Sequence, residues 1–187
     1  NSALSEAQIQ SVEDGAVTLY HNGNAKLATA SGGVDVTGAI TATSDVTISA
    51  SSATLNITGS NTGSSLINFG DSDDGNVGRI YYDHTSNYMQ FKTNDSEKAR
   101  IDSSGNVGIG VVPETWYSGF SALQLSDTGV LVGENVGGES SMSIGENYYV
   151  DASGNTEYLT TDEASVYQQN NGTHAFRVAA SGTADTA

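Results

Sequence analysis

The chain has 187 residues and no cysteine, so it spans one or two small domains without disulfides or thiolate metal sites. Its 22 Asp and Glu residues outweigh six Lys and Arg residues and give a net charge of −16. This charge excludes the basic surface that nucleic-acid phosphates require, and it argues against binding to anionic membranes. The sequence also contains no apolar run close to the roughly 20 residues that a membrane span needs.

The N-terminal segment, residues 1–15, carries the one helix-like pattern in the sequence. Within residues 4–13 a short apolar stripe recurs at helical spacing, and Ser5 followed by Gln8 fits a capping box. A helix of this length is not stable alone in water. We interpret it as the end of a helical stem, with a frayed terminus as the alternative.

Residues 16–62 predict a slim β shaft. Asn22-Gly23 separates Val17–His21 from Asn24–Leu27 and predicts a type I′ hairpin, in which both central residues need positive φ. Small polar residues then separate three apolar pairs at strand period: Val34 and Val36, Val46 and Ile48, and Leu55 and Ile57. Such narrow faces suit a shaft where three chains meet around one axis; a flexible Ser/Thr linker is the alternative.

Residues 63–112 predict a first β-module. Its expected strands, Leu66–Phe69, Gly78–Asp83 and Tyr88–Lys92, are separated by polar turns. The acidic turn Asp71–Asn76 departs from an EF-hand loop, because its glycine falls at the fifth position. A solvated hairpin turn is the simpler interpretation.

The module ends in an alternating stretch after a Ser-Ser-Gly-Asn turn. Val107 and Ile109 alternate with Gly108 and Gly110. Glycines at alternate strand positions leave one face without side chains, where a neighbouring backbone can approach closely. We interpret this strand as packed near an axis shared by several chains.

Residues 113–187 predict a connector, one or two further strands, and a second β-module that repeats the first. Five residues of the first module align without gaps to five of the second: Asn94, Arg100, Ile101, Ser104 and Gly105 to Asn171, Arg177, Val178, Ser181 and Gly182. Such self-similarity is typical of modules stacked along a rod.

No catalytic or cofactor-binding pattern is present, so we expect no enzyme, no cofactor and no metal site within one chain. His21, His84 and His174 stand alone, although a threefold axis would bring three copies of one histidine together. Paired carboxylates for sugar hydrolysis depend on separation in space, so a polysaccharide depolymerase stays open as an alternative.

Aromatic residues of the connector and second module are the candidate surface contacts. They are Trp116, Tyr117, Tyr148 and Tyr149. Trp116 and Tyr117 follow Pro113 in an expected loop, which favours exposure. Sugar stacking is one role for such side chains; filling module cores and seams between chains is the other.

The 22 glycines bear on the association state. Each costs roughly 0.5–1 kcal/mol of extra backbone entropy inside an element, and the apolar faces are slim. A lone monomer would therefore be marginal, and intertwining of several chains would supply the missing burial.

The run from Ala99 to Gly110 resembles a signature of bacteriophage tail-fibre proteins, which commonly precedes a self-cleaving chaperone domain. That domain has no counterpart here. Further stretches resemble fibre segments: Leu19–Thr29, Gly33–Ile40, Thr161–Ser165, His174–Val178 and Ser181–Asp185. Related runs also occur in bacterial surface proteins.

The resemblance implies an all-β, elongated and intertwined homotrimeric fibre of stacked β-modules in the tail of a virion. Its expected partners are other copies of itself, other tail proteins and a host surface glycan or protein receptor, without nucleic acid or membrane insertion. A repeat of a bacterial adhesin or surface filament is the alternative owner of the same architecture.

Overall fold

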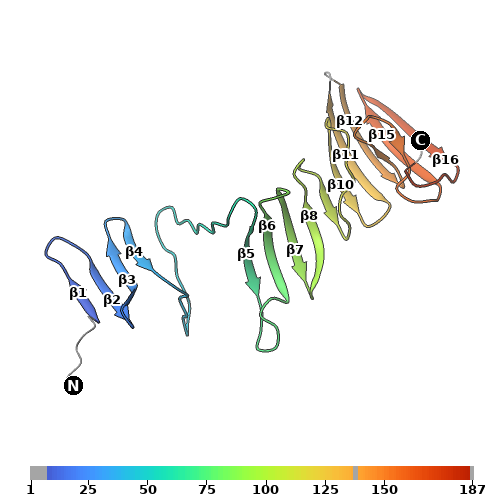
Figure 1. The fold of residues 1–187 in the computed structure, drawn as a ribbon. Helices are drawn as coiled ribbons and strands as arrows, with labels where there is room; N and C mark the ends of the chain where they lie inside the picture. The colour runs from blue at the N-terminus through green and yellow to red at the C-terminus, as the bar shows by residue number, and fades with distance from the viewer. Residues whose placement is uncertain (1–7, 137–138, 186–187) are drawn as a thin grey trace. The chain divides into compact units, whose positions relative to one another are not determined.

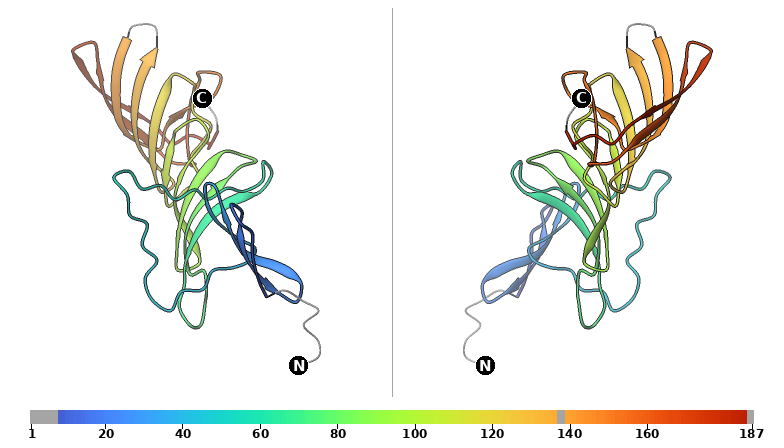
Figure 2. Two further views of the ribbon diagram at one scale, coloured as in Figure 1. Left: turned by 90° about the vertical axis from the view of Figure 1, so that its left-hand side faces the viewer. Right: turned by 90° about the vertical axis from the view of Figure 1, so that its right-hand side faces the viewer.

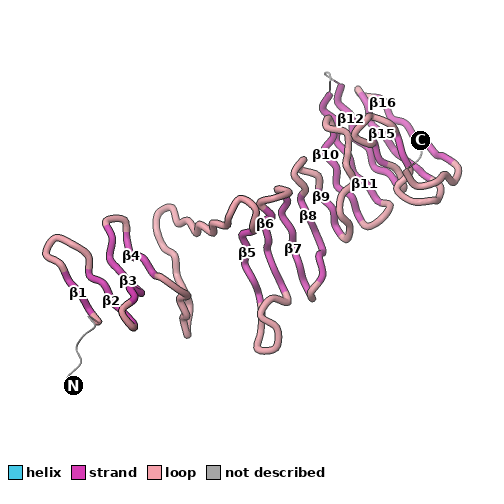
Figure 3. Tube along the Cα trace, in the orientation of Figure 1, coloured by secondary structure: helices cyan, strands magenta, loops and turns pink. Residues whose placement is uncertain are grey.

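The computed structural model describes residues 8–136 and 139–185, in which sixteen strands and no helix are present (Figures 1 and 3). This confirms the all-β class. The chain divides into two compact units, the first ending at Leu55 and the second beginning at Asn56.

The first unit is a four-stranded antiparallel meander. Its strands are β1 (Ile9–Ser11), β2 (Val17–His21), β3 (Asn24–Ala30) and β4 (Gly33–Val36). Asn22 and Gly23 join β2 to β3 with φ of 49° and 72°, which confirms the predicted hairpin.

The predicted N-terminal helix is wrong over the described part of residues 4–13. Ile9–Ser11 form β1, in which Ile9 lies opposite Leu19. The Tyr20 N–H donates to the Gln8 carbonyl at 2.8 Å, so the pairing extends beyond the strand. A short helical pattern gives little stability by itself, and the edge of β2 offers it a full set of backbone partners. Residues 4–7 lie outside the described residues.

Of the three apolar pairs that were predicted to lie in strands of the slim shaft, only one lies in a strand. Val34 and Val36 lie in β4, whereas the structure assigns no strand between residues 37 and 63. Val46 is 73% exposed and Leu55 is 64% exposed. Without a neighbouring strand in the same chain, alternating apolar residues there have no ladder to join.

The second unit is built on one ten-stranded sheet that spans both expected modules. Its strands, in spatial order, are β5 (Ser64–Phe69), β6 (Gly78–Asp83), β7 (Tyr88–Thr93), β8 (Ser96–Ile101), β9 (Val107–Ile109), β10 (Phe120–Leu125), β11 (Gly129–Val136), β12 (Glu139–Glu146), β15 (Ala164–Asn170) and β16 (Thr173–Ala179). The three strands expected in the first module correspond to β5, β6 and β7. The expected connector strands are β10 and β11.

Every neighbouring pair in this sheet is antiparallel except β9 and β10. A parallel step requires a crossover, because the chain must return to the end where it started. Residues 110–119 make that crossover. A second excursion between β12 and β15 contains the hairpin of β13 (Tyr149–Val150) and β14 (Thr156–Glu157).

The two excursions meet on one face of the sheet. Trp116 of the crossover forms an isolated bridge with Asp151, next to β13. Figure 1 shows β5–β8 as a single layer, whereas the views of Figure 2 show C-terminal loops folded back beside β10–β16. We call the face that these excursions contact the covered face, and the opposite one the open face.

The core lies on the covered face of β10–β12. It consists of Trp116, Ala122, Val130, Val132 and Tyr149, with Phe120, Tyr148 and Leu159 packed against it. All buried residues of the described chain lie between Asn106 and Tyr149, and none is buried from residue 8 to 105. A large part of the chain therefore forms sheet without forming a core.

The close approach predicted at the alternating glycines is confirmed at Gly108, but its partner is different. A Cβ on Gly108 would lie 2.2 Å from the Val111 carbonyl oxygen and 2.8 Å from Cδ of Pro113. The interpretation of a shared axis at this face is therefore wrong, because the chain's own crossover occupies it. Gly110 is needed for a different reason, since its φ is 75°.

Candidate functional site

The structure brings together the four aromatic residues singled out from the sequence, but not on the surface. Trp116 is only 4% exposed and Tyr149 only 8%, so the prediction that they are surface contacts is wrong. Their rings meet edge to face with centroids 5.9 Å apart. Tyr117 and Tyr148 are half-buried, and Tyr117 packs edge to face on Phe120.

Backbone and amide hydrogen bonds place Trp116 against the sheet. Gln124 of β10 is 1% exposed, and its Oε1 accepts from the Glu114 N–H at 3.0 Å. The Tyr117 N–H donates to the Val150 carbonyl at 2.9 Å. The crossover is thereby attached to β10 on one side and to β13 on the other, which fixes the indole between them.

Asn147 fixes the start of the second excursion. Its side chain is 1% exposed, and its Oδ1 accepts from the Thr160 N–H at 2.6 Å and from Thr160 Oγ1 at 3.0 Å. Its Nδ2 donates to the carbonyls of Thr160 and Glu163 at 3.1 and 2.9 Å. One amide thus ties the turn that precedes Tyr148 and Tyr149 to the loop that precedes β15.

Two turns of the unit have the same sequence pattern and the same geometry. In Asp102–Asn106 and Asp151–Asn155, the first carboxylate accepts from two backbone N–H groups at 2.8–2.9 Å and from the last asparagine's Nδ2 at 3.2 Å. Gly105 and Gly154 both have φ of 90°. The repeat Asp-x-Ser-Gly-Asn was readable in the sequence and is a closer internal match than the Tyr pairs of the two modules.

Asn106 links the first of these turns to the core. It is 2% exposed, and its Oδ1 accepts from the buried Ala122 N–H of β10 at 3.0 Å. Buried amides such as Asn106, Gln124 and Asn147 were missed by the sequence reasoning, because their partners are backbone groups far away along the chain.

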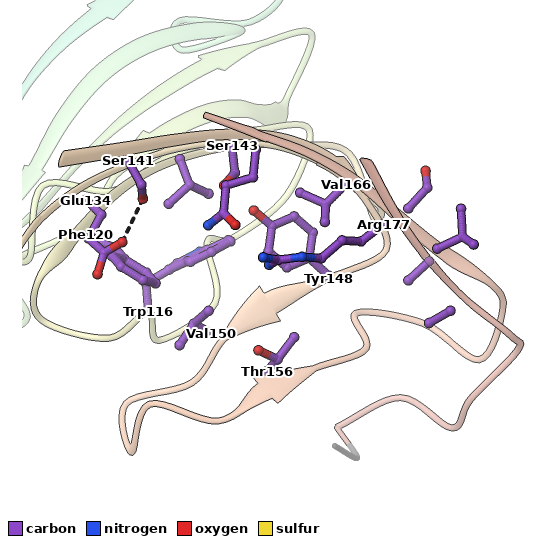
Figure 4. A pocket seen from close by; sticks show the side chains of 16 residues that line it. Trp116, Phe120, Glu134, Ser141, Ser143, Tyr148, Val150, Thr156, Val166 and Arg177 are labelled. Atoms are coloured by element: carbon purple, nitrogen blue, oxygen red, sulfur yellow. Dashed lines mark hydrogen bonds between the residues drawn. The ribbon is translucent and has the colours of Figure 1, made fainter. Parts of the chain in front are cut away.

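A cavity of about 370 Å³ lies between the covered face and the second excursion (Figure 4). Trp116, Phe120 and Tyr148 supply its aromatic lining. Its polar lining comes from seven residues: Glu134, Ser141, Ser143, Thr156, Ser165, Gln168 and Arg177. Tyr148 lies directly on Gly145, where any Cβ would come within 2.2 Å of the ring.

The polar groups of the cavity differ in how they are satisfied. Glu134 accepts a hydrogen bond of 2.6 Å from Ser141. The indole N–H of Trp116 is buried and has no partner among the described residues. The guanidinium of Arg177 makes neither of the two ion pairs found in the described chain, which join Lys92 to Asp95 and Arg100 to Glu97.

Burial perturbs the titratable groups around this region. Burial, together with the hydrogen bond from its hydroxyl to Asp185 at 3.1 Å, raises the pKa of Tyr149 to about 12. Burial also raises the pKa of Tyr148 and that of Glu114, the latter with a contribution from the nearby charge of Asp185. At neutral pH both tyrosines are therefore neutral hydrogen-bonding groups.

The open face carries two rows of aligned side chains across the ten-stranded sheet. One row, in register order, is Met89, Ile101, Val107, Leu123, Leu131, Ile144, Tyr167 and Phe176. The other runs through Ile67, Ile80, Phe91, Ala99, Ile109 and Leu125. Ile144 is 52% exposed and Phe176 is 82% exposed. Ile101, Ile109 and Leu125 of these rows are 38%, 48% and 45% exposed.

The remaining candidates stand as turns and isolated side chains. The Asp71 carboxylate accepts from the backbone N–H groups of Asp74 and Asp73, which lowers its pKa and closes the acidic turn. His84 shares a hydrogen bond with Ser65, and His174 with Tyr167. The described residues contain no group of three His, Cys, Asp or Glu side chains placed to hold a metal ion.

Comparison with known proteins identifies no relative: no family model, no curated protein and no solved structure matches the chain. Within residues 8–136 and 139–185, no helix has the length and hydropathy to cross a membrane.

Proposed function

We propose that the chain is a structural and receptor-binding segment of a bacteriophage tail fibre, assembled as a homotrimer and attaching the virion to the host surface. The family and the number three come from the resemblance of residues 99–110 to the tail-fibre signature. The need for partner chains is supported independently by the way the apolar residues are distributed.

The observation that carries the proposal is that much of the β-sheet has no buried core beneath it. No described residue before Asn106 is buried, yet four strands of the first unit and four of the second lie in that stretch. Isolated sheets with no covering layer are marginal in water, because they bury too little apolar surface to offset the entropy of ordering. A partner layer would resolve this.

The open face is the surface that such a partner would cover. Full burial of a large apolar side chain contributes about 1.5–3 kcal/mol. Covering only Ile109, Ile144 and Phe176, of which Ile109 is 48% exposed, would contribute on the order of 4 kcal/mol. Covering the rest of both rows adds to this and also protects unpaired sheet edges.

The test is the mass of the chain in solution by light scattering, with and without denaturant. We expect a trimer that dissociates only on unfolding. A well-folded monomer would remove the physical basis of the proposal, and a dimer would remove its stoichiometry.

A pair of matched variants locates the interface. Ile144→Asp places a charge in the middle of an apolar row, so we expect dissociation or loss of folding. Thr85→Asp places the same charge in the exposed turn between β6 and β7 and leaves the assembly intact. A trimer that persists in Ile144→Asp shows that the open face is not where the chains meet.

A further inference from the structure

The cavity behind Trp116 has the composition of a ligand site rather than of a packing defect. Its volume of about 370 Å³ falls in the range of roughly 300–1,000 Å³ that small-molecule sites occupy. Packing defects are small and apolar. Here seven polar residues from β11, β12, β14, β15 and β16 line the cavity together with three aromatic residues.

The groups are arranged so that one ligand would meet two kinds of surface. Figure 4 shows Trp116 and Phe120 at one end beside Ser141 and Glu134, with Tyr148 between them and Arg177. A sugar ring has the matching character, because its C–H groups pack on aromatic side chains while its hydroxyls need donors and acceptors. An aliphatic ligand would leave the polar groups of the lining unpaired at a cost.

Arg177 decides the charge of that ligand. It lies on the covered face in register with Val166, and in Figure 4 its side chain extends alongside the ring of Tyr148. Its guanidinium has no carboxylate partner among the described residues, although the sequence contains 22 Asp and Glu residues. Glu134, the acid in the lining, is engaged by Ser141. A guanidinium recognises a carboxylate through two parallel hydrogen bonds.

We infer that this cavity binds a saccharide unit bearing a carboxylate, of the hexuronic-acid type. Arg177 takes the carboxylate, Gln168 and Glu134 take ring hydroxyls, and the aromatic side chains pack against the ring carbons. The unpartnered indole N–H of Trp116 is one further donor on a lining residue. The inference rests on the proposed attachment role for its biological meaning, but the cavity lies within one chain.

Trp116 is the single tryptophan, so its fluorescence reports on this cavity and on no other place in the chain. The full assembled chain is titrated with glucuronate, galacturonate and mannuronate and their disaccharides, each against its uncharged hexose counterpart. Physiological salt screens the chain's own negative charge, with a Debye length of about 8 Å at 0.15 M ionic strength. We expect a saturable change with at least one acidic saccharide and a weaker one with its uncharged counterpart.

Arg177→Gln removes the charge and keeps a hydrogen-bonding side chain at an exposed position, so the fold is retained. We expect affinity for the acidic saccharide to fall on the order of 10- to 100-fold. Arg79→Gln is the matched control, since Arg79 lies on β6 and is bonded to Asn68. We expect the affinity of Arg79→Gln for the acidic saccharide to be unchanged.

Three results overturn the inference: no response to any acidic saccharide at millimolar concentration, equal affinity for the uncharged counterparts, or full affinity in Arg177→Gln. If the chain is a trimer by light scattering and gives one of these results, the saccharide site is refuted and the proposed assembly is not. If the chain is a monomer and binds the acidic saccharide through Arg177, the assembly is refuted and the saccharide site is not.

Discussion

Asn147→Ala tests how much of the second unit depends on one buried amide. The substitution removes four side-chain hydrogen bonds and takes away the partner of the Thr160 N–H and of the Glu163 carbonyl, whereas the Thr160 carbonyl still accepts from the Asp162 N–H. Each such bond contributes about 0.5–1.5 kcal/mol net, and a stranded buried group costs about 1–3 kcal/mol. Asn147 also has φ of 58°, where alanine is strained by about 1–2 kcal/mol. The terms overlap, and we expect a loss of about 3–5 kcal/mol.

Urea denaturation at one fixed protein concentration measures this loss, because the stability of an assembly varies with concentration. Asn171→Ala is the matched control: Asn171 has φ of 45°, but it is exposed, and its side chain accepts one long hydrogen bond, from the Ser140 N–H at 3.5 Å. We expect it to cost about 1 kcal/mol. Asn147→Gly relieves the strain and loses the bonds, so it falls between the two. If both alanine variants lose the same stability, the reasoning from the hydrogen bonds is refuted.

Three further predictions concern single positions. In Gly108→Ala the new Cβ clashes with the Val111 carbonyl, so we expect the free energy of unfolding to fall by at least about 2 kcal/mol in urea denaturation. In the control Gly133→Ala the new Cβ meets nothing within 4 Å, so we expect no change. Equal losses of stability in the two variants would contradict the packing of the crossover on Gly108. The raised pKa of Tyr149 predicts that its contribution to the free energy of unfolding is complete below pH 10 and is lost as the pH rises from the unfolded-state pKa of 10.0 through the folded-state pKa of about 12. We expect Tyr149→Phe to lose less stability over this pH range. Parallel curves of stability against pH for the two proteins would argue against this reasoning. Backbone N–H groups lower the pKa of Asp151 below 3.8, so the stability that its carboxylate contributes is present above that pH and is lost as the pH falls through the folded-state pKa. We therefore expect Asp151→Asn to be less stable than the unchanged chain at neutral pH and equally stable in acid. A loss of stability that does not vary with pH would count against this mechanism.

Local signals in the sequence predicted the hairpins well. Asn22 and Gly23 need positive φ, and so do Asn94 and Asn171 at equivalent turns of the two aligned stretches. The turn chemistry is contained within a few residues, so the sequence suffices to place β2, β3, β6 and β7.

Features that depend on distant partners were not predicted. Nothing local shows that β9 pairs in parallel with β10, and it is this pairing that carries Trp116 over the covered face and buries it. The glycine at 108 correctly indicated a close approach, but a glycine does not identify what approaches. The same limit explains the error at Ile9–Ser11, where the edge of β2 decides the conformation.

In the ten-stranded sheet, nearly every strand bonds to the one that precedes or follows it along the polypeptide. Pairing can consequently proceed largely in step with translation, since among the described strands of this sheet the pair β12 and β15 alone is separated by other strands along the chain. Evolution can also add or delete a hairpin at either end of such a ladder without rethreading the remainder. This freedom is lost in the passage from Ile109 to Phe120, whose length is tied to the indole it delivers, and in the excursion between β12 and β15.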